Sequence, residues 1–290
     1  MEAVIGNVRR DLWVGTFACR LSGAKLLQRR GIARALKSGP ISRWLYTHAV
    51  ERIIVNAPAI RDAMLQGVDF LEASRFVLIP NGVDTENLPC GRGEKIRAEL
   101  GLDGSIPLVA CIGRLAPMKG HVHLLRAWRH VRASVPGARL LIAGEGDEAP
   151  SLEALAANLG LEDSVHFLGF RRDVDDLLEA MDLLVLPSVR DEGCNNTLLE
   201  AMAHGRAAVV TRCGGLHQSV VEGETGIVVP SGDEEALGNA VTRLLLEPEE
   251  RRRMGIAARK VVEERYSSAK VTDQLEGFLR SLRGRREESR

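Results

Sequence analysis

The sequence has 290 residues, of which 45% are hydrophobic, and its 39 Lys and Arg residues balance its 39 Asp and Glu residues, which indicates a globular protein of about two domains. The lack of any run of about 18 apolar residues excludes a membrane-spanning helix, and we expect no secretory signal because the N-terminus lacks its pattern. Aromatic residues make up 4% of the chain and none of the usual nucleic-acid-binding modules is present, so no nucleic-acid partner is expected.

The first 52 residues are strongly basic. They hold ten basic and three acidic residues, a net charge of +7 (ten minus three), so the remaining residues carry −7. The basic residues are Arg9, Arg10, Arg20, Lys25, Arg29, Arg30, Arg34, Lys37, Arg43 and Arg52. Such a cluster suits an anionic partner, and with leucines between its members residues 9–52 could rest on an anionic membrane surface. A solvated face of the protein is the alternative interpretation.

From residue 108 onward, short apolar segments alternate with helical patterns. The expected strands are Leu108–Ile112, Leu140–Ala143, Val165–Leu168, Leu183–Leu186, Ala207–Val210 and Ile227–Val229. The expected helices are Leu124–Val135, Leu152–Leu159, Val174–Met181, Thr197–Ala203, Glu234–Leu246 and Glu249–Glu264, followed by an amphipathic segment Val271–Leu282 and a charged tail. Continuous apolar strands separated by helices predict a doubly wound parallel sheet whose ligand lies beyond the carboxyl ends of the strands.

The most informative stretch runs from Ser188 to Val210. A buried strand, a short loop with Gly193 and a helix that begins near Asn195 come in succession, and this arrangement brings backbone N–H groups together where an anion can bind. The side chain of Asn195 or Asn196 is also a suitable N-cap, and the two roles are compatible. At about 100° per residue, one face of the helix is apolar and the other is polar. The apolar face holds Leu198, Leu199, Met202 and Ala203, and the polar face holds Asn196, Glu200 and His204.

Seven residues separate Glu192 from Glu200. With the segments around them, these glutamates resemble the E-x7-E signature of retaining glycosyltransferases with the GT-B fold (the family 4-like group, glycosyl transferases group 1). Other landmarks of that family match in order over about residues 10–280. They are Ile79–Asp84, the phosphate-binding element Gly113–Gly120 (GRL…KG), Leu141–Gly146, Phe167–Phe170 and Gly214–Gly215.

The resemblance implies three parts along the chain. Residues 1–90 would form a partial N-terminal α/β acceptor domain, residues 91–265 a complete Rossmann-like donor domain, and residues 266–290 an amphipathic helix with a charged tail. Trp13–Gly31 and Trp44–Gln66 correspond to the last strands and helices of an acceptor domain, with Glu51–Val55 as a strand. The first half of that domain, with the family's glycine-rich loop, has no counterpart. A truncated product, a missed upstream start and a donor domain that needs another chain all fit this expectation.

The implied activity is transfer of a sugar from a nucleotide diphosphate-sugar to a glycan or lipid-linked acceptor with retention of configuration, as in polysaccharide or lipopolysaccharide synthesis. Negative charge builds on the leaving diphosphate, so Arg114 as a bidentate fork and Lys119 as a point charge are expected to stabilise it. Glu192 would hydrogen-bond the donor sugar and support positive charge in the transition state. No cofactor and no metal ion is expected, because these cations replace a divalent ion.

The remaining implied donor-binding residues surround the diphosphate and the nucleoside. Glu200 would accept hydrogen bonds from the ribose hydroxyls, and Phe170 and Arg171 would lie beside the nucleobase. The full donor-binding set is Gly113, Phe170, Arg171, Gly193, Cys194, Asn195, Asn196, Thr197 and Glu200.

Two departures from the family pattern concern particular residues. Gln218 stands where relatives carry Glu, and a neutral amide keeps hydrogen bonding but not charge. Arg206–Ala207 replaces the usual x-Pro after Gly205. A non-catalytic nucleotide-sugar-binding remnant, or a partner subunit that lacks most of its acceptor domain, therefore stays as the alternative function.

Two other motifs suggest different chemistry and are disfavoured. Gly144–Ala149 fits the dinucleotide fingerprint G-x-G-x-x-A, but Glu145, Asp147 and Glu148 would repel a pyrophosphate. His121 and His123 have metal-like spacing without an evident carboxylate or Cys partner, so surface or helix-cap positions are expected. The cysteines form no C-x-x-C pair and indicate reduced thiols in a cytoplasmic protein. They are Cys19, Cys90, Cys111, Cys194 and Cys213.

Overall fold

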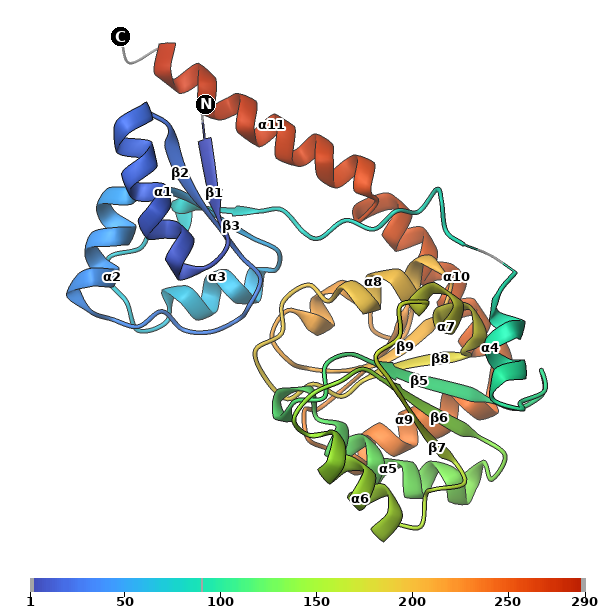
Figure 1. The fold of residues 1–290 in the computed structure, drawn as a ribbon. Helices are drawn as coiled ribbons and strands as arrows, with labels where there is room; N and C mark the ends of the chain where they lie inside the picture. The colour runs from blue at the N-terminus through green and yellow to red at the C-terminus, as the bar shows by residue number, and fades with distance from the viewer. Residues whose placement is uncertain (1–2, 90, 288–290) are drawn as a thin grey trace. The chain divides into compact units, whose positions relative to one another are not determined.

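The computed structural model describes residues 3–89 and 91–287. It divides the chain into two compact units. Unit 1 comprises Met1–Gly82, Asp191–Cys194 and Ser268–Arg290, and unit 2 comprises Val83–Arg190 and Asn195–Ser267. In both units every pairing between the described strands is parallel, and helices flank each sheet (Figure 1).

Unit 1 is built on a sheet in the order β1-β2-β3-β4. Its strands are β1 (Ala3–Gly6), β2 (Lys25–Arg30), β3 (Val50–Val55) and β4 (Phe76–Leu78). Its helices are α1 (Arg9–Ser22), α2 (Pro40–Trp44), which continues as a π-helical turn (Leu45–Ala49), α3 (Pro58–Leu65) and α11 (Ser268–Glu287). The strand expected at Glu51–Val55 is β3.

Alternate residues of the strands in unit 1 point to opposite faces of the sheet, as a period of two requires. Leu26 and Ile53 pack with Leu12 of α1 and Ile60 of α3. Leu27 and Ile54 face the other way. They pack against the apolar side of α11, whose contributing residues are Val271, Leu275, Phe278, Leu279 and Leu282. The amphipathic segment expected at Val271–Leu282 therefore covers one face of this sheet.

Unit 2 has a sheet in the order β10-β9-β8-β5-β6-β7. The strands are β5 (Leu108–Ile112), β6 (Arg139–Ala143), β7 (Val165–Gly169), β8 (Leu183–Leu186), β9 (Ala207–Thr211) and β10 (Gly226–Val229). The helices are α4 (Gly93–Glu99), α5 (His121–Ser134), α6 (Ala149–Asn158), α7 (Val174–Ala180), α8 (Asn196–Ala203), α9 (Glu234–Leu246) and α10 (Pro248–Arg265). The predicted doubly wound parallel fold is confirmed, and α4 is an additional helix that the sequence pattern did not predict.

Helices cover both faces of this sheet, with α5, α6 and α9 on one side and α4, α7, α8 and α10 on the other (Figure 1). Trp128 of α5 is fully buried, and its indole N–H donates to Ser164 Oγ at 3.3 Å. The chain runs from β5 outward to β6 and β7, and then returns to build β8, β9 and β10 on the other side of β5. This reversal between β5 and β8 is a topological switch point, where open α/β sheets form a crevice at their carboxyl edge.

Candidate functional site

Backbone hydrogen bonds join the loop after β5 to the loop after β6. Gly113 N–H donates to Ala143 O at 2.9 Å, and Leu115 N–H donates to Glu145 O at 2.8 Å. Because the side chain of Leu115 is buried and anchors the loop, the neighbouring Arg114 is left exposed. Arg114 therefore extends from a fixed backbone at the switch point.

The glycines of the second loop permit this close packing. A Cβ atom at Gly144 would lie 2.0 Å from Gly113 O, and one at Gly146 would lie 2.0 Å from Leu115 O. Both distances are far inside van der Waals contact, so only glycine fits. The G-x-G-x-x-A pattern that resembles a dinucleotide fingerprint thus has a structural cause in unit 2.

A cavity of about 320 Å³ opens beside these loops. Phe170 and Arg171, which follow β7, line it together with Gly113 and Arg114. The ring of Phe170 is 63% exposed, so it offers an aromatic face at the rim of the cavity. Three of the residues expected to bind the donor and Arg114, expected to stabilise the leaving diphosphate, thus surround one cavity within unit 2.

The guanidinium group of Arg171 is already engaged by two carboxylates. It forms a bidentate pair with Glu99, at 2.6 and 3.0 Å, and a second with Asp173, at 2.9 and 2.7 Å. The hydrogen bonds that Arg171 donates to Glu99 and Asp173 raise its pKa above the ordinary value. Arg171 therefore joins α4 to the start of α7. It forms part of the cavity wall, and its guanidinium group is already occupied by the two carboxylates.

Lys119 lies in a 3₁₀ turn, Pro117–Lys119, immediately before α5. Gly120 follows with φ of 70°, and a Cβ atom there would lie 2.1 Å from Pro187 O. Val189 N–H also donates to Met118 O at 2.8 Å. The turn that carries Lys119 is therefore held directly against the segment after β8.

Helix α8 begins at Asn196, and Asn195 is its N-cap. Asn195 Oδ1 accepts a hydrogen bond from Leu198 N–H at 3.0 Å, so the cap belongs to Asn195. The predicted faces of the helix are confirmed. Leu198, Leu199, Met202 and Ala203 are buried, whereas Asn196 is exposed and Thr197, Glu200 and His204 are half-buried.

Glu200 is a carboxylate in a partly buried setting. Burial, and then the nearby negative charge of Asp175, raise the pKa of Glu200. The carboxylate of Asp175 also forms a hydrogen bond with His204 Nε2 at 3.2 Å. The side chains of Glu200 and His204 thus sit together on the polar face of α8.

Asp191–Cys194, which includes Glu192 and Gly193, groups with unit 1 through its contacts. Asn56 Oδ1 accepts from Cys194 N–H at 3.3 Å, and Asn81 Nδ2 donates to Cys194 O at 2.9 Å. Glu192 is 7% exposed. Asn56 and Asn81 were not among the site residues expected from the sequence. The only signals were the position of Asn56 after a strand and that of Asn81 in the matched segment Ile79–Asp84.

The backbone of this segment is constrained. Asp191 has φ of 64°, a left-handed conformation that is uncommon outside glycine, and its carboxylate pairs with Arg34 at 3.0 Å. A Cβ atom at Gly193 would lie 2.4 Å from Gly31 O. Contacts within the protein therefore already require glycine at position 193.

The two departures from the family pattern have different settings. Arg206 Nε donates to Leu178 O at 3.1 Å, and its terminal nitrogen donates to Glu179 O, so the side chain satisfies carbonyls at the end of α7. Burial lowers the pKa of Arg206. Gln218 lies exposed in a short 3₁₀ turn, Leu216–Ser219.

His121 lies at a helix start, as expected, but it is not on the surface. His121 is the first residue of α5 and is 3% exposed, and neither ring nitrogen has a hydrogen-bond partner in the described part of the chain. Burial, and then the positive charge of Lys119, lower its pKa to about 4. His123 is half-buried and meets Glu234 Oε1 at 3.0 Å.

Over the described residues, no group of three or more His, Cys, Asp and Glu side chains could hold a metal ion. Cys19, Cys111, Cys194 and Cys213 are buried, and Cys90 lies outside the described residues. Among the described helices, none has the length and apolar character that a transmembrane segment requires.

The sequence profile of the family described as "Glycosyl transferases group 1" matches residues 93–261, more than half of the 290 residues. The chain belongs to this family. Among curated relatives, this glycosyltransferase family member is 31% identical over 258 residues to alpha-D-kanosaminyltransferase of Streptomyces kanamyceticus, covering 84% of this chain and 64% of the relative. It is 33% identical over 236 residues to D-inositol 3-phosphate glycosyltransferase of Saccharomonospora viridis, covering 78% of this chain and 54% of the relative.

A third relative is the GDP-mannose-dependent alpha-(1-6)-phosphatidylinositol monomannoside mannosyltransferase of Mycolicibacterium smegmatis. It is 35% identical over 192 residues, covering 62% of this chain and 50% of the relative. The chain thus spans about half to two thirds of the length of these curated relatives.

Solved structures show the fold. The Anabaena HepE structure in complex with UDP and glucose superimposes with a TM-score of 0.86 at 23% identity, covering 97% of this chain and 78% of that one. Sucrose-phosphate synthase of Thermosynechococcus elongatus superimposes with a TM-score of 0.84 at 24% identity, covering 97% and 74%. The chain therefore has the α/β architecture of GT-B glycosyltransferases.

Proposed function

We propose that this chain transfers a sugar from a nucleotide diphosphate-sugar to a glycan or lipid-linked acceptor, with retention of configuration. The observation that carries this proposal is the carboxyl edge of unit 2. There, an exposed Arg114 and a cavity with an aromatic rim lie at the switch point of a parallel sheet. Relatives named for transfer to inositol phosphate and to a phosphatidylinositol mannoside, and the UDP in the HepE complex, support this reading.

Stabilisation of the leaving diphosphate is the main requirement of this reaction. When the anomeric C–O bond breaks, Arg114 and Lys119 supply fixed positive charge, and the N–H groups at the start of α8 add the positive end of the helix dipole. The glycine contacts keep this backbone in place before substrate binds, so little reorganisation is needed. No metal ion and no organic cofactor takes part in this step.

The other site residues bind the nucleoside and the sugar. The exposed ring of Phe170 provides a stacking surface for the nucleobase. Glu200 accepts hydrogen bonds from the ribose hydroxyls. Glu192 hydrogen-bonds hydroxyls of the donor sugar and offsets positive charge at the anomeric carbon.

A peripheral membrane role, at the cytoplasmic face, also has a specific observation in its favour. Helix α1 exposes large apolar side chains, and exposed Arg10 and Arg20 lie on the same helix. The apolar residues are Trp13, Val14, Phe17 and Leu21, which are 44%, 72%, 69% and 76% exposed. Such a helix can lie in the plane of an anionic membrane with its aromatic residues at the headgroups. This would bring the protein to a lipid-linked acceptor.

Calorimetric titration of the full chain with UDP, GDP and ADP, without added metal, tests the donor site. Saturable binding of one nucleotide that is lost in Arg114→Ala would support the site and identify its base. Turnover of the matching nucleotide-sugar then distinguishes a transferase from a non-catalytic nucleotide-sugar-binding protein. Gln218, which stands where relatives carry Glu, is the reason to consider that alternative. Lack of binding to all three nucleotides would overturn the proposal.

A further inference from the structure

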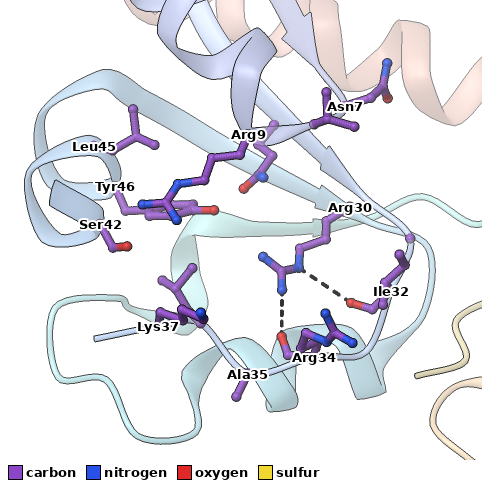
Figure 2. A pocket seen from close by; sticks show the side chains of 14 residues that line it. Asn7, Arg9, Arg30, Ile32, Arg34, Ala35, Lys37, Ser42, Leu45 and Tyr46 are labelled. Carbon is purple, nitrogen blue, oxygen red and sulfur yellow. Dashed lines mark hydrogen bonds between the residues drawn. The ribbon is translucent and has the colours of Figure 1, made fainter. Parts of the chain in front are cut away.

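A second cavity, of about 390 Å³, lies in unit 1 and is distinct from the one beside Phe170. It opens where β1 ends at Gly6 and β2 ends at Arg30, and the segment from Ile32 to Lys37 and the turn after α2 close it (Figure 2). The carboxyl ends of parallel strands are the usual place for ligands in α/β folds. The volume is within the range of small-molecule sites.

The cavity is strongly cationic. Arg9, Arg30, Arg34 and Lys37 line it, and none of the described lining residues is acidic. Figure 2 shows these side chains entering from α1, from the end of β2 and from the segment after β2. Arg34 is partly neutralised by Asp191, at 3.0 Å. Within the described residues, Arg9 and Lys37 have no carboxylate partner.

One of the arginines is held in position. Arg30 donates from its terminal nitrogen to Arg34 O at 2.7 Å and from Nε to Ile32 O at 3.5 Å (Figure 2). These bonds to main-chain carbonyls fix the guanidinium without neutralising its charge. A charged group held in this way is pre-organised for an anionic ligand.

The floor of the cavity contains a buried amide without a partner. Gln28 of β2 is 4% exposed, and its Oε1 has no hydrogen-bond partner in the described part of the chain. Burying an acceptor without a donor is costly. A ligand hydroxyl that donates to Gln28 would remove this cost. Ser42 and Tyr46, which are 6% and 4% exposed, line the same floor.

We propose that this cavity binds a phosphorylated polyol group, with the phosphate held by Arg9, Arg30 and Lys37 and a hydroxyl donating to Gln28. The identification of this ligand with the acceptor of the transfer reaction rests on the proposed function, whereas the binding of a phosphorylated polyol does not. The ion pair between Arg34 and Asp191 connects this cavity to the segment that carries Glu192.

The first experiment titrates the full chain calorimetrically with glycerol 3-phosphate and with glycerol, in the absence of nucleotide. We expect saturable binding of the phosphate compound only. Arg9→Gln/Lys37→Gln should raise its Kd about tenfold or more, because two charge-assisted contacts are lost. Arg10→Gln/Lys95→Gln is the matched control, since it removes the same charge from exposed positions outside the cavity. Its Kd should stay within about twofold of the unsubstituted chain.

Gln28→Leu tests the buried amide without changing charge. It should remove the advantage in affinity that glycerol 3-phosphate has over inorganic phosphate, and it should leave thermal stability unchanged or higher because the orphan acceptor is gone. Dibutyryl phosphatidylglycerol, whose headgroup keeps free hydroxyls beside the phosphate, then identifies the source of the phosphate. Tighter binding than glycerol 3-phosphate assigns a lipid headgroup, and equal binding assigns a free polyol phosphate. Either result supports a phosphate site.

Three results would overturn the inference. They are equal binding of glycerol and glycerol 3-phosphate, unchanged affinity in Arg9→Gln/Lys37→Gln, and loss of phosphate binding in Arg114→Ala instead. Nucleotide titration of the same variants keeps this test separate from the donor site. If no nucleotide binds but the glycerol 3-phosphate results hold, the proposed function fails and the phosphate site stands.

Discussion

The backbone of Gly120 lies directly against the carbonyl group of Pro187, so that a Cβ atom at position 120 would be 2.1 Å from that oxygen. With Val189 N–H donating to Met118 O at 2.8 Å, this contact joins the turn of Lys119 to the end of β8. The two loops that flank the switch point therefore form one rigid backbone assembly within unit 2.

Gly120→Ala should disrupt that assembly. The new methyl group meets backbone, and φ of 70° is unfavourable for alanine, so we expect a loss of about 2 kcal/mol or more in the free energy of unfolding. Gly137→Ala is the control, because nothing lies within 4 Å of its Cβ position. Urea unfolding of both variants checks this prediction. Equal midpoints would show that the Gly120 contact is not needed.

Phe170→Ala and Arg171→Ala should separate binding from stability, although both residues line the same cavity. Loss of the exposed ring should weaken nucleotide binding about tenfold and leave the unfolding midpoint unchanged, as expected for a stacking contact. Arg171→Ala leaves Glu99 and Asp173 unpaired, so it should lower stability by about 1–2 kcal/mol. Calorimetry and thermal unfolding test the pair. A stability loss in Phe170→Ala would contradict this division of roles.

Glu179 should stabilise unit 2 in a pH-dependent way. Burial alone would raise its pKa, but hydrogen bonds from the backbone N–H groups of Gly91, Arg92 and Gly93, at 2.6, 2.7 and 2.9 Å, outweigh this and lower it from 4.5. A lowered pKa means that the stabilisation is complete above the unfolded value and is lost as pH falls through the folded value.

Glu179→Gln should therefore cost about 1 kcal/mol near neutral pH, and the difference from the unsubstituted chain should shrink as pH falls below about 4.5. Glu162→Gln, at an exposed position, is the control and should change little. Urea unfolding at several pH values measures the difference. If it were constant down to the acid limb, the ionised carboxylate would not be its source.

His121 predicts a further loss of stability on acidification, which begins at a higher pH than that of Glu179. Its pKa is lowered from 6.5 to about 4 in the folded chain, so between these values the unfolded state binds a proton that the folded state does not. Stability is then lost as pH falls from about 6.5 to about 4, by at most about 3 kcal/mol. His121→Leu should flatten this part of the stability profile. A profile that is unchanged in the variant would place the acid sensitivity elsewhere.

Local sequence was sufficient for the sheet of unit 2 and the helices between its strands. The six expected strands and the helices between them were confirmed, because their apolar spacing reports burial on one or both sides of each element. The same spacing defined both faces of α8, including the exposed Asn196 and the half-buried Glu200. The sequence left open whether Asn195 or Asn196 caps the helix, and the hydrogen bond from Leu198 N–H to Asn195 Oδ1 decides for Asn195.

Tertiary structure decided what depends on residues far apart in the chain. The sequence could not show that α11 covers the sheet of unit 1, that Gly193 meets Gly31, or that His121 is buried. It also did not show that Arg206 binds carbonyls at the end of α7. Periodicity encodes which side of an element faces a core, but not which distant backbone or side chain it meets there, because that depends on how the chain returns.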